Sequence, residues 1–383
     1  MRLRTGSTTL NSIALHPAGI RRSNPPSVPV PLLRFLGCLA FGLALSFAPA
    51  IALAQPSAPE SLLVTGETHI RNLRQLTFGG ENAEGYFSFD EQRVILQSTR
   101  PPFHCDQEYI LDLKTDSATL VSTGRGRTTC GYFLPGDSAI LFSSTHAGAP
   151  ECPAPPDYSQ GYVWAIYPDY DIYTASDRGR HLKALAPAPG YDAEATVSPT
   201  GESIVFTSLR SGDLDLYAMN IDGTNIRQLT NETGYDGGAF YSWDGRLIVY
   251  RAWHHTDSAS AAAYKSLLRQ NLVRPSRMEL FVMNADGTGK RQITDNGAAN
   301  FAPFFHPDNK RIIFASNLSD PGGRNFDLYM ISIDGTGLTR ITLNQTFDGF
   351  PMFTHDGKRL IFASNRNAKV KGETNLFIAD WVE

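Results

Sequence analysis

One phrase recurs six times, with variations, from residue 73 to the end of the 383-residue chain. Each copy holds an Arg-x-Leu/Ile-Thr segment, an aromatic segment ending in a turn of the Ser-Pro-Asp-Gly kind, an apolar segment closing on serine, and an acidic or amide residue that opens another apolar segment. These segments have the length and residue types of short strands, and Asp-Gly supplies the positive φ of a tight hairpin. The repeat predicts an all-β fold, a six-bladed β-propeller of four-stranded antiparallel blades.

The two ends of the repeated region predict how the ring closes. The last copy stops after its third strand, at residues 375–380, whereas an unpaired fourth strand at residues 73–77 precedes the first copy. We therefore expect the N-terminal strand to complete the C-terminal blade, which leaves no free sheet edge at the seam. The propeller is expected to span residues 73–383, behind an N-terminal extension at residues 55–72.

The repeated elements resemble those of TolB-type propellers with WD40-like (PD40) repeats. They include the Leu-Thr segments, the Ser-Pro-Asp-Gly-like turns, Phe-Ala-Ser-Asn-Arg at residues 362–366 and Asp-Leu-Tyr at residues 215–217 and 327–329. The resemblance covers nearly all of residues 65–383, and similar repeats occur in the propeller domains of prolyl-oligopeptidase-like enzymes. It implies protein partners in the cell envelope. TolB itself carries an α/β domain before its propeller and the peptidases carry an α/β-hydrolase domain, and we expect neither here.

Residues 1–54 predict an export signal with a long leader. The apolar run from Leu36 to Ala54 follows Arg34 and ends in a small-x-small pattern that a signal peptidase accepts. An uncleaved membrane anchor is the alternative, but Pro49 within the run and the small residues at its end favour cleavage. We expect a periplasmic or secreted protein with no stable membrane span after cleavage.

Charge and cysteine content narrow the partners and the compartment. The leader holds five arginines and no acidic residue, so its removal leaves 29 basic against 38 acidic residues and a net charge of −9. A chain this acidic is a poor partner for nucleic acid or anionic lipid. Of Cys105, Cys130 and Cys152, two can pair in an exported protein, and their spacing does not select the pair.

No recognised catalytic motif occurs in the sequence. It has no Gly-x-Ser-x-Gly, no His-Glu-x-x-His, no glycine-rich phosphate loop and no Cys-x-x-Cys. The adjacent His254 and His255 stand out among the histidines, but neighbours in a strand point to opposite sides and do not readily hold one metal. We therefore name no catalytic residue and favour a binding protein over an enzyme.

Two rings of residues emerge when the six innermost strands are aligned on their turns. The first contains Asn82, Thr128, Asp192, Asp236, Asn300 and Asp348, and the second, two residues further along, contains Glu84, Cys130, Glu194, Gly238, Ala302 and Phe350. Strand alternation would point both rings the same way, into one mouth of the central channel, where five carboxylates would converge. Oxygen-rich clusters suit Ca²⁺, another divalent cation or a cationic ligand group. The metal candidates are Asp192, Glu194, Asp236 and Asp348, and no other cofactor is expected. The alternative is that these Asp and Asn residues cap strand starts.

Two insertions follow second strands, at residues 145–168 and 254–277, and both should overhang the same mouth. The first is rich in aromatic residues and proline and includes Tyr162 and Trp164. The second, in blade 4, predicts one short helix that Asp257 or Ser258 caps and Pro275 ends. The insertions either bind a ligand or partner, or plug the channel.

These expectations describe a non-catalytic, TolB-like, monomeric propeller that binds an envelope or secreted protein partner, or a small ligand, at its loop-rich mouth. The candidate contacts are Glu84, Thr128, Cys130, Asp192, Glu194, Asp236, Asn300, Asp348, Tyr162 and Trp164. The alternative is a metal-assisted lyase or hydrolase acting on an oligosaccharide or peptide at that mouth.

Overall fold

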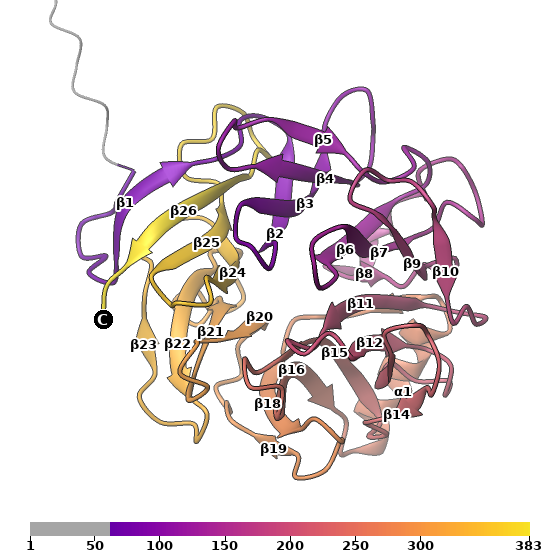
Figure 1. The fold of residues 1–383 in the computed structure, drawn as a ribbon. Helices are drawn as coiled ribbons and strands as arrows, with labels where there is room; N and C mark the ends of the chain where they lie inside the picture. Colours follow the sequence, from indigo (N-terminus) through magenta and orange to yellow (C-terminus); the bar gives the residue numbers. More distant parts are fainter. Residues whose placement is uncertain (1–61) are drawn as a thin grey trace, which may run out of the picture. The chain divides into compact units, whose positions relative to one another are not determined.

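The computed structural model describes residues 62–383, in which six four-stranded antiparallel sheets surround one axis (Figure 1). The predicted six-bladed propeller is confirmed. The predicted leader, residues 1–54, and the first part of the extension lie outside the described residues.

In blades 1 to 5 the strands follow chain order from the axis to the rim. Blades 1 and 2 consist of β2 (Glu81–Phe87), β3 (Arg93–Thr99), β4 (Gln107–Asp112) and β5 (Ala118–Leu120), and of β6 (Thr128–Phe133), β7 (Ala139–Ser144), β9 (Asp171–Ser176) and β10 (Lys183–Leu185). Blades 3 and 4 consist of β11 (Asp192–Val197), β12 (Ser203–Ser208), β13 (Asp215–Asn220) and β14 (Arg227–Gln228), and of β15 (Gly234–Tyr241), β16 (Leu247–His254), β18 (Glu279–Asn284) and β19 (Arg291–Gln292). Blade 5 consists of β20 (Asn300–Phe305), β21 (Arg311–Ser316), β22 (Asp327–Ser332) and β23 (Thr339–Arg340).

Blade 6 joins the two ends of the propeller. It consists of β24 (Asp348–Phe353), β25 (Arg359–Ser364), β26 (Asn375–Trp381) and β1 (Ile70–Gln75). Ile70 pairs with Trp381 and Gln75 with Phe377, and Figure 1 shows the indigo β1 beside the yellow β26. The predicted closure is confirmed, with β1 beginning three residues earlier than residue 73.

Apolar second strands form the core between blades. Val94, Ile95 and Leu96 of β3 are fully buried, as are the equivalent triplets of the other blades. Consecutive buried residues show that both faces of each sheet are covered, which a blade achieves only by packing against its neighbours. The threonine of each Arg-x-Leu/Ile-Thr segment accepts a hydrogen bond from the backbone of the third strand. In blade 3, for example, the Thr230 hydroxyl accepts the Leu216 N–H at 2.8 Å.

The two insertions meet above the sheets. They contain η1 (Tyr158–Gln160), β8 (Trp164–Ala165), α1 (Ser258–Leu268) and β17 (Leu272–Val273), which together we call the cap. Strand β8 pairs with β17, so the insertions of blades 2 and 4 join in one small sheet. Asp257 caps α1 as predicted, but the helix ends at Leu268, before Pro275, because Leu272 and Val273 pair with β8 instead.

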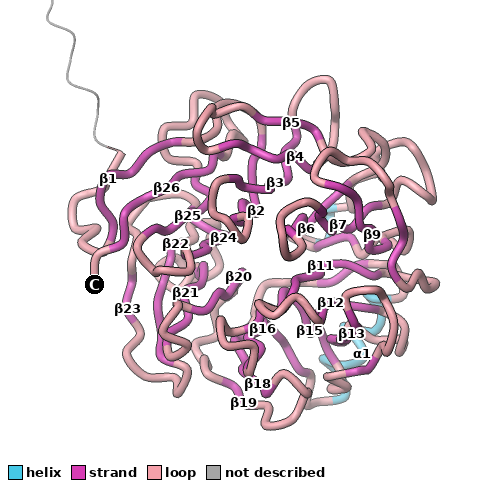
Figure 2. Tube along the Cα trace, in the orientation of Figure 1, coloured by secondary structure: helices cyan, strands magenta, loops and turns pink. Residues whose placement is uncertain are grey.

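The buried face of α1 packs against blades 3 and 4. Tyr264 and Leu268 lie in one cluster with Leu214 and Tyr235, and Figure 2 shows the cyan helix beside those blades. Of the helices in residues 62–383, none has both the length and the apolar character needed to cross a membrane.

Candidate functional site

A β-bulge at the same place in all six innermost strands shapes the channel. Pairing between the first two strands shifts by one residue there, for example between Ala83 and Tyr86. The bulged residue has a positive φ in every blade, at Glu84, Cys130, Glu194, Gly238, Ala302 and Phe350. Because non-glycine residues adopt this conformation at a cost, its presence in five of six blades marks a constraint of the fold.

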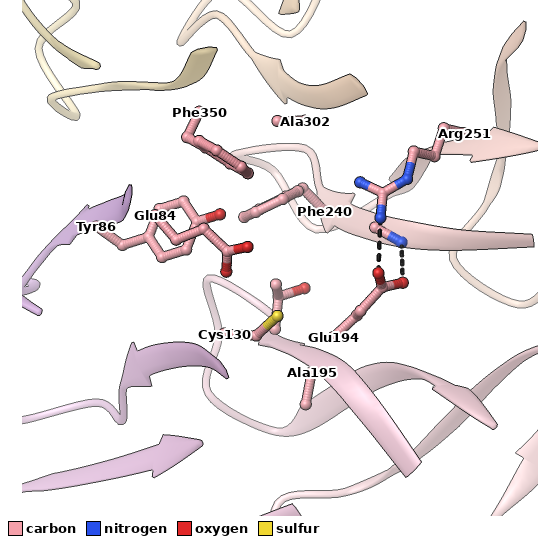
Figure 3. A pocket seen from close by; sticks show the side chains of 11 residues that line it. Glu84, Tyr86, Cys130, Glu194, Ala195, Phe240, Arg251, Ala302 and Phe350 are labelled. Atoms are coloured by element: carbon pink, nitrogen blue, oxygen red, sulfur yellow. Dashed lines mark hydrogen bonds and ion pairs between the residues drawn. The ribbon is translucent and has the colours of Figure 1, made fainter. Parts of the chain in front are cut away.

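The bulge separates the two aligned rings. All six residues of the second ring, which we call the channel layer, line one cavity of about 30 Å³ on the axis (Figure 3). None of the first ring, which we call the strand-start ring, lines it. The expectation of a shared side-chain direction is therefore wrong, since a bulge interrupts the alternation on which it rested. Of the five carboxylates expected to converge, only Glu84 and Glu194 line the cavity.

The strand-start ring is buried inside the blades and is paired there. Asp192 meets Arg210 at 2.8 Å, and Asp348 meets Arg366 at 2.8 Å. The remaining members bind within their own blades or the adjacent loop: Asn82 accepts from Arg100 and Ser98, Asn300 accepts from Ser316, Thr128 donates to the Asp106 carbonyl, and Asp236 contacts His254. These contacts give the ring a structural role, but they go to side chains and a carbonyl and not to the backbone N–H groups of the capping alternative.

One ion pair dominates the channel layer. Arg251 of β16 lies 2.6 Å from Glu194 and stacks near the Trp164 ring of the cap, 5.3 Å from its centroid. Glu194 also accepts from the Tyr235 hydroxyl and from the Gly238 N–H, both at 2.8 Å. Figure 3 shows the guanidinium above the Glu194 carboxylate. Glu194 is therefore fully hydrogen-bonded and fixed in position.

Gly238 makes room for this arginine. A Cβ at residue 238 would lie 2.4 Å from an Arg251 guanidinium nitrogen. The other five blades carry a side chain at this position, whereas blade 4 places a guanidinium from its second strand there. The sequence alignment placed Gly238 in the second ring but gave it no role. The signal for Arg251 was a lone charge inside the apolar strand β16.

A second group of ionisable side chains lies unpaired between blades 1 and 2. Glu84 faces the Cys130 thiol, which donates to it, and burial, reinforced by the nearby Glu194 charge, raises the pKa of Glu84 to about 7. Glu108 is fully buried, and neither of its carboxyl oxygens has a hydrogen-bond partner within residues 62–383. Burial, with Glu84 nearby, raises the pKa of Glu108 well above its usual range. Both carboxyls therefore stay protonated in the folded protein at mildly acidic pH, where a free carboxyl is ionised.

The sequence alignment placed Glu108 with the acidic or amide residues that open the third strands, but Gln107 holds that place and Glu108 lies one residue further along. The equivalent residue of every other blade is apolar: Ile172, Leu216, Leu280, Leu328 and Leu376. Like Leu376 against Gly85, Glu108 packs against the glycine of the next blade, Gly131, whose Cβ would lie 2.5 Å from its carboxylate. A carboxyl thus occupies a position that the fold otherwise keeps apolar.

Aromatic side chains narrow the channel beside this layer. The Tyr86 ring lies 5.6 Å from that of Tyr132 and 5.5 Å from that of Phe240, so side chains of blades 1, 2 and 4 meet across the axis. The contact explains why the cavity is small. At about 30 Å³ it has room for roughly one water molecule or ion.

The mouth, the channel end where the innermost strands begin, is covered on one side only. The cap packs against blades 3 and 4 and reaches blade 5, where the Trp164 and Phe301 ring centroids lie 5.1 Å apart, while Tyr162 is half exposed. A disulfide between Cys105 and Cys152 ties the first insertion to blade 1 and leaves Cys130 free. The pairing that the sequence left open is thereby assigned.

The uncovered side of the mouth holds the larger cavity. About 370 Å³ in volume, it lies between blades 6 and 1, and Phe350 is common to it and the channel cavity. Its lining includes Glu81, Asp106 and Glu373 but no lysine or arginine, and Phe347 lies beside Phe350. The space therefore combines negative charge with aromatic surface.

The predicted metal candidates do not share one centre. Asp192 and Asp348 face arginines, and Glu194 faces Arg251, so each is already neutralised by a cation. Only Asp236 lies among other groups that could bind a metal, because Glu232 and His254 place ligand atoms within 4.8 Å of it and of one another.

The comparisons with known proteins agree with this geometry at the level of fold. No family model matches the chain. TolB structures from Agrobacterium tumefaciens and Acinetobacter baumannii both superpose with a TM-score of 0.51 at 17% identity. The first alignment covers 79% of this chain and 91% of that protein, and the second covers 70% of this chain and 55% of that protein. The fold is thus a TolB-like six-bladed propeller.

One short stretch also matches a curated enzyme. It is 51% identical over 39 residues to dipeptidyl-peptidase 5 of Porphyromonas gingivalis. The match spans 10% of this chain and only 6% of that enzyme's length. A segment of this size is about one repeat, so the activity of the peptidase is not transferred by it.

Proposed function

We propose that the protein is an exported, non-catalytic propeller that binds a protein partner or a small ligand through a cationic group at the uncovered side of its mouth. The observation that carries the proposal is the cavity of about 370 Å³ between blades 6 and 1. A space of this size admits a side chain or a small molecule, whereas the channel cavity does not.

The charge of this cavity supports a cationic occupant. Glu81 is exposed at its rim, and the nearby Asp106 is only partly neutralised by Arg127 at 3.0 Å. Phe347 and Phe350 add ring faces on which an ammonium or guanidinium group can lie. An acidic cleft with low-dielectric walls also concentrates cations from solution.

The disulfide supports the proposed compartment. Cystine bridges persist in the periplasm and outside the cell, and are rare where thiols are kept reduced. The Cys105–Cys152 bridge therefore accords with export by the predicted leader. The partner expected from the TolB resemblance would then be an envelope or secreted protein, met by a monomer of this chain.

Binding can be tested with one charge reversal and one matched control. Glu81→Lys places a cation at the rim, and Glu202→Lys reverses an exposed charge in the turn at the opposite end of blade 3. Immobilised wild type and both variants are exposed to envelope extract, and bound proteins and small molecules are identified by mass spectrometry. We expect one set of ligands to be lost with Glu81→Lys and kept with Glu202→Lys. Identical recovery from all three would reject this cavity as the site.

A second candidate function, a lyase or hydrolase, is favoured by one observation. The Glu84 carboxyl has a pKa of about 7 and lies on the channel, which suits a general acid or base. A ligand recovered in the first experiment is incubated with wild type and with Glu84→Gln. Conversion by the wild type and not by the variant would replace the binding proposal, whereas an unchanged ligand supports it.

A further inference from the structure

Blade 4 departs from the other blades at the pocket behind its strand-start residue. In blade 6 this pocket holds Asp348, which receives Arg366 at 2.8 Å and the Asn344 amide at 3.3 Å. The Ser364 hydroxyl also hydrogen-bonds Asp348. Each lone pair that faces the pocket therefore has a donor, and an arginine balances the carboxylate.

Three substitutions change that balance in blade 4. His254 stands where blades 1, 3 and 6 have arginine, Glu232 stands where blades 5 and 6 have asparagine, and Ala252 stands where the other five blades have serine. The pocket thus loses a fixed cation and a hydroxyl donor. It gains an imidazole nitrogen and a second carboxylate, and both are ligands for metal ions.

Asp236 shows the result of these changes. It is completely buried, and its Oδ1 lies 2.8 Å from His254 Nε2. Its Oδ2 has no hydrogen-bond partner within the described part of the chain. The Thr230 hydroxyl lies near enough to interact with the Asp236 carboxyl, but its own hydrogen bond goes to Asp215, at 3.4 Å. A buried carboxylate oxygen without a donor is rare unless an ion or water satisfies it.

An ordinary ion pair accounts for only part of this arrangement. A protonated His254 would neutralise the charge of Asp236. It would still leave Asp236 Oδ2 without a donor, and it would not explain the second carboxylate, Glu232, in the same pocket. Lys290 lies 3.5 Å from Glu232 Oε1, at the solvent side of the pocket, and is the nearest counter-charge to that carboxylate. Both His254 and Glu232 are partly exposed, which leaves a path for an ion to enter.

We propose that Glu232, Asp236 and His254 bind one divalent transition-metal ion, best represented by Zn²⁺, with water completing its coordination. One imidazole and two carboxylates match the three-ligand sets that zinc accepts, and the ligand atoms already lie within 4.8 Å of one another. The site is separate from the proposed ligand cavity between blades 6 and 1 and does not depend on it.

The test replaces two of the three ligands by the residue that another blade uses. Full chain without a histidine tag is treated with chelator and titrated with ZnCl₂ by calorimetry, and its melting temperature is followed. We expect wild type to bind one equivalent and to melt at higher temperature with zinc. His254→Arg, the residue of blades 1, 3 and 6, should weaken binding at least 100-fold, and Glu232→Asn at least tenfold.

Two further variants separate metal binding from folding. Ala252→Ser restores the hydroxyl donor and should also weaken zinc binding while keeping or raising the melting temperature of the metal-free protein. His146→Arg changes the equivalent histidine of blade 2, where Thr128 replaces the carboxylate, and should leave binding unchanged. Absence of zinc uptake by wild type, or full affinity in His254→Arg, would overturn the proposal.

Discussion

The strand-start ring and the channel layer lie only two residues apart in sequence, but they differ in whether their carboxylates are paired with a cation. In the ring, Asp192 and Asp348 each meet a buried or half-buried arginine. In the channel layer only Glu194 is paired, while Glu84 and the adjoining Glu108 are kept neutral by burial. Matched charges are consistent with structural support, whereas unmatched buried carboxyls destabilise a protein and are commonly retained for function.

The largest effect is expected from breaking the best-matched member of the ring. Arg366 lies between Asp348 at 2.8 Å and Glu67 of the N-terminal extension at 3.1 Å, with all three side chains buried. Arg366→Met leaves two buried carboxylates without a cation and should lower the free energy of unfolding by about 3–5 kcal/mol. Urea denaturation measures the change.

An exposed pair provides the control for this prediction. Arg74 and Asp116 lie 3.1 Å apart at the surface. Arg74→Met should change the free energy of unfolding by less than about 1 kcal/mol. If Arg366→Met and Arg74→Met lowered the free energy of unfolding equally, the buried ion pair would stabilise the protein no more than an exposed one.

A change in the opposite direction is expected at Glu108. Glu108→Leu gives blade 1 the residue that blades 3 to 6 have at this position and removes two buried oxygens without partners. It should raise the free energy of unfolding by about 1–3 kcal/mol. The pKa of Glu108 is raised in the folded state, so ionisation of this carboxyl favours the unfolded chain as pH rises. The stability gained by Glu108→Leu should therefore be larger at pH 8 than at pH 5. A loss of stability would show that this carboxyl is satisfied in solution.

A smaller loss is expected when the paired member of the channel layer is disturbed. Gly238→Ala places a methyl group 2.4 Å from the Arg251 guanidinium and displaces it from Glu194, which should destabilise the protein by about 1–2 kcal/mol. Gly136→Ala is the control, because Gly136 also has a positive φ but nothing within 4 Å. Equal losses in thermal denaturation would assign the whole effect to backbone strain.

The last comparison concerns the pH dependence of stability. Burial raises the pKa of Glu84 from 4.5 to about 7, so between these pH values the unfolded chain ionises and the folded protein does not. The free energy of unfolding should therefore fall as pH rises through this window. Glu84→Gln should remove that fall, which amounts to at most about 1.4 kcal/mol for each pH unit of the window. Parallel stability curves for variant and wild type from pH 4 to pH 8 would contradict the raised pKa.

The fold was predictable because each blade repeats the same local chemistry. Turn residues, buried triplets and the Arg-x-Leu/Ile-Thr threonines recur at fixed positions, and the unpaired ends of the repeat predicted the seam between β1 and β26. The alignment also found all six members of the channel layer.

The side-chain directions in the site were not predictable in the same way. The bulge needs a residue with a left-handed backbone conformation, for which glycine is the usual sequence signal. Only Gly238 gives that signal, whereas Glu84, Cys130, Glu194 and Phe350 adopt the conformation without it. Arg251 and Glu108 come from second and third strands, so alignment of first strands could not reveal them. Their signal was a charge where neighbouring blades are apolar.

Because β1 is the rim strand of the blade that β24, β25 and β26 begin, blade 6 is incomplete until the seven-residue β26 joins a segment made more than three hundred residues earlier. A nascent chain could assemble blades 1 to 5 in order, but it would keep an open gap in the ring until β26 was made. Removing β26 should accordingly weaken the whole ring and not one blade alone.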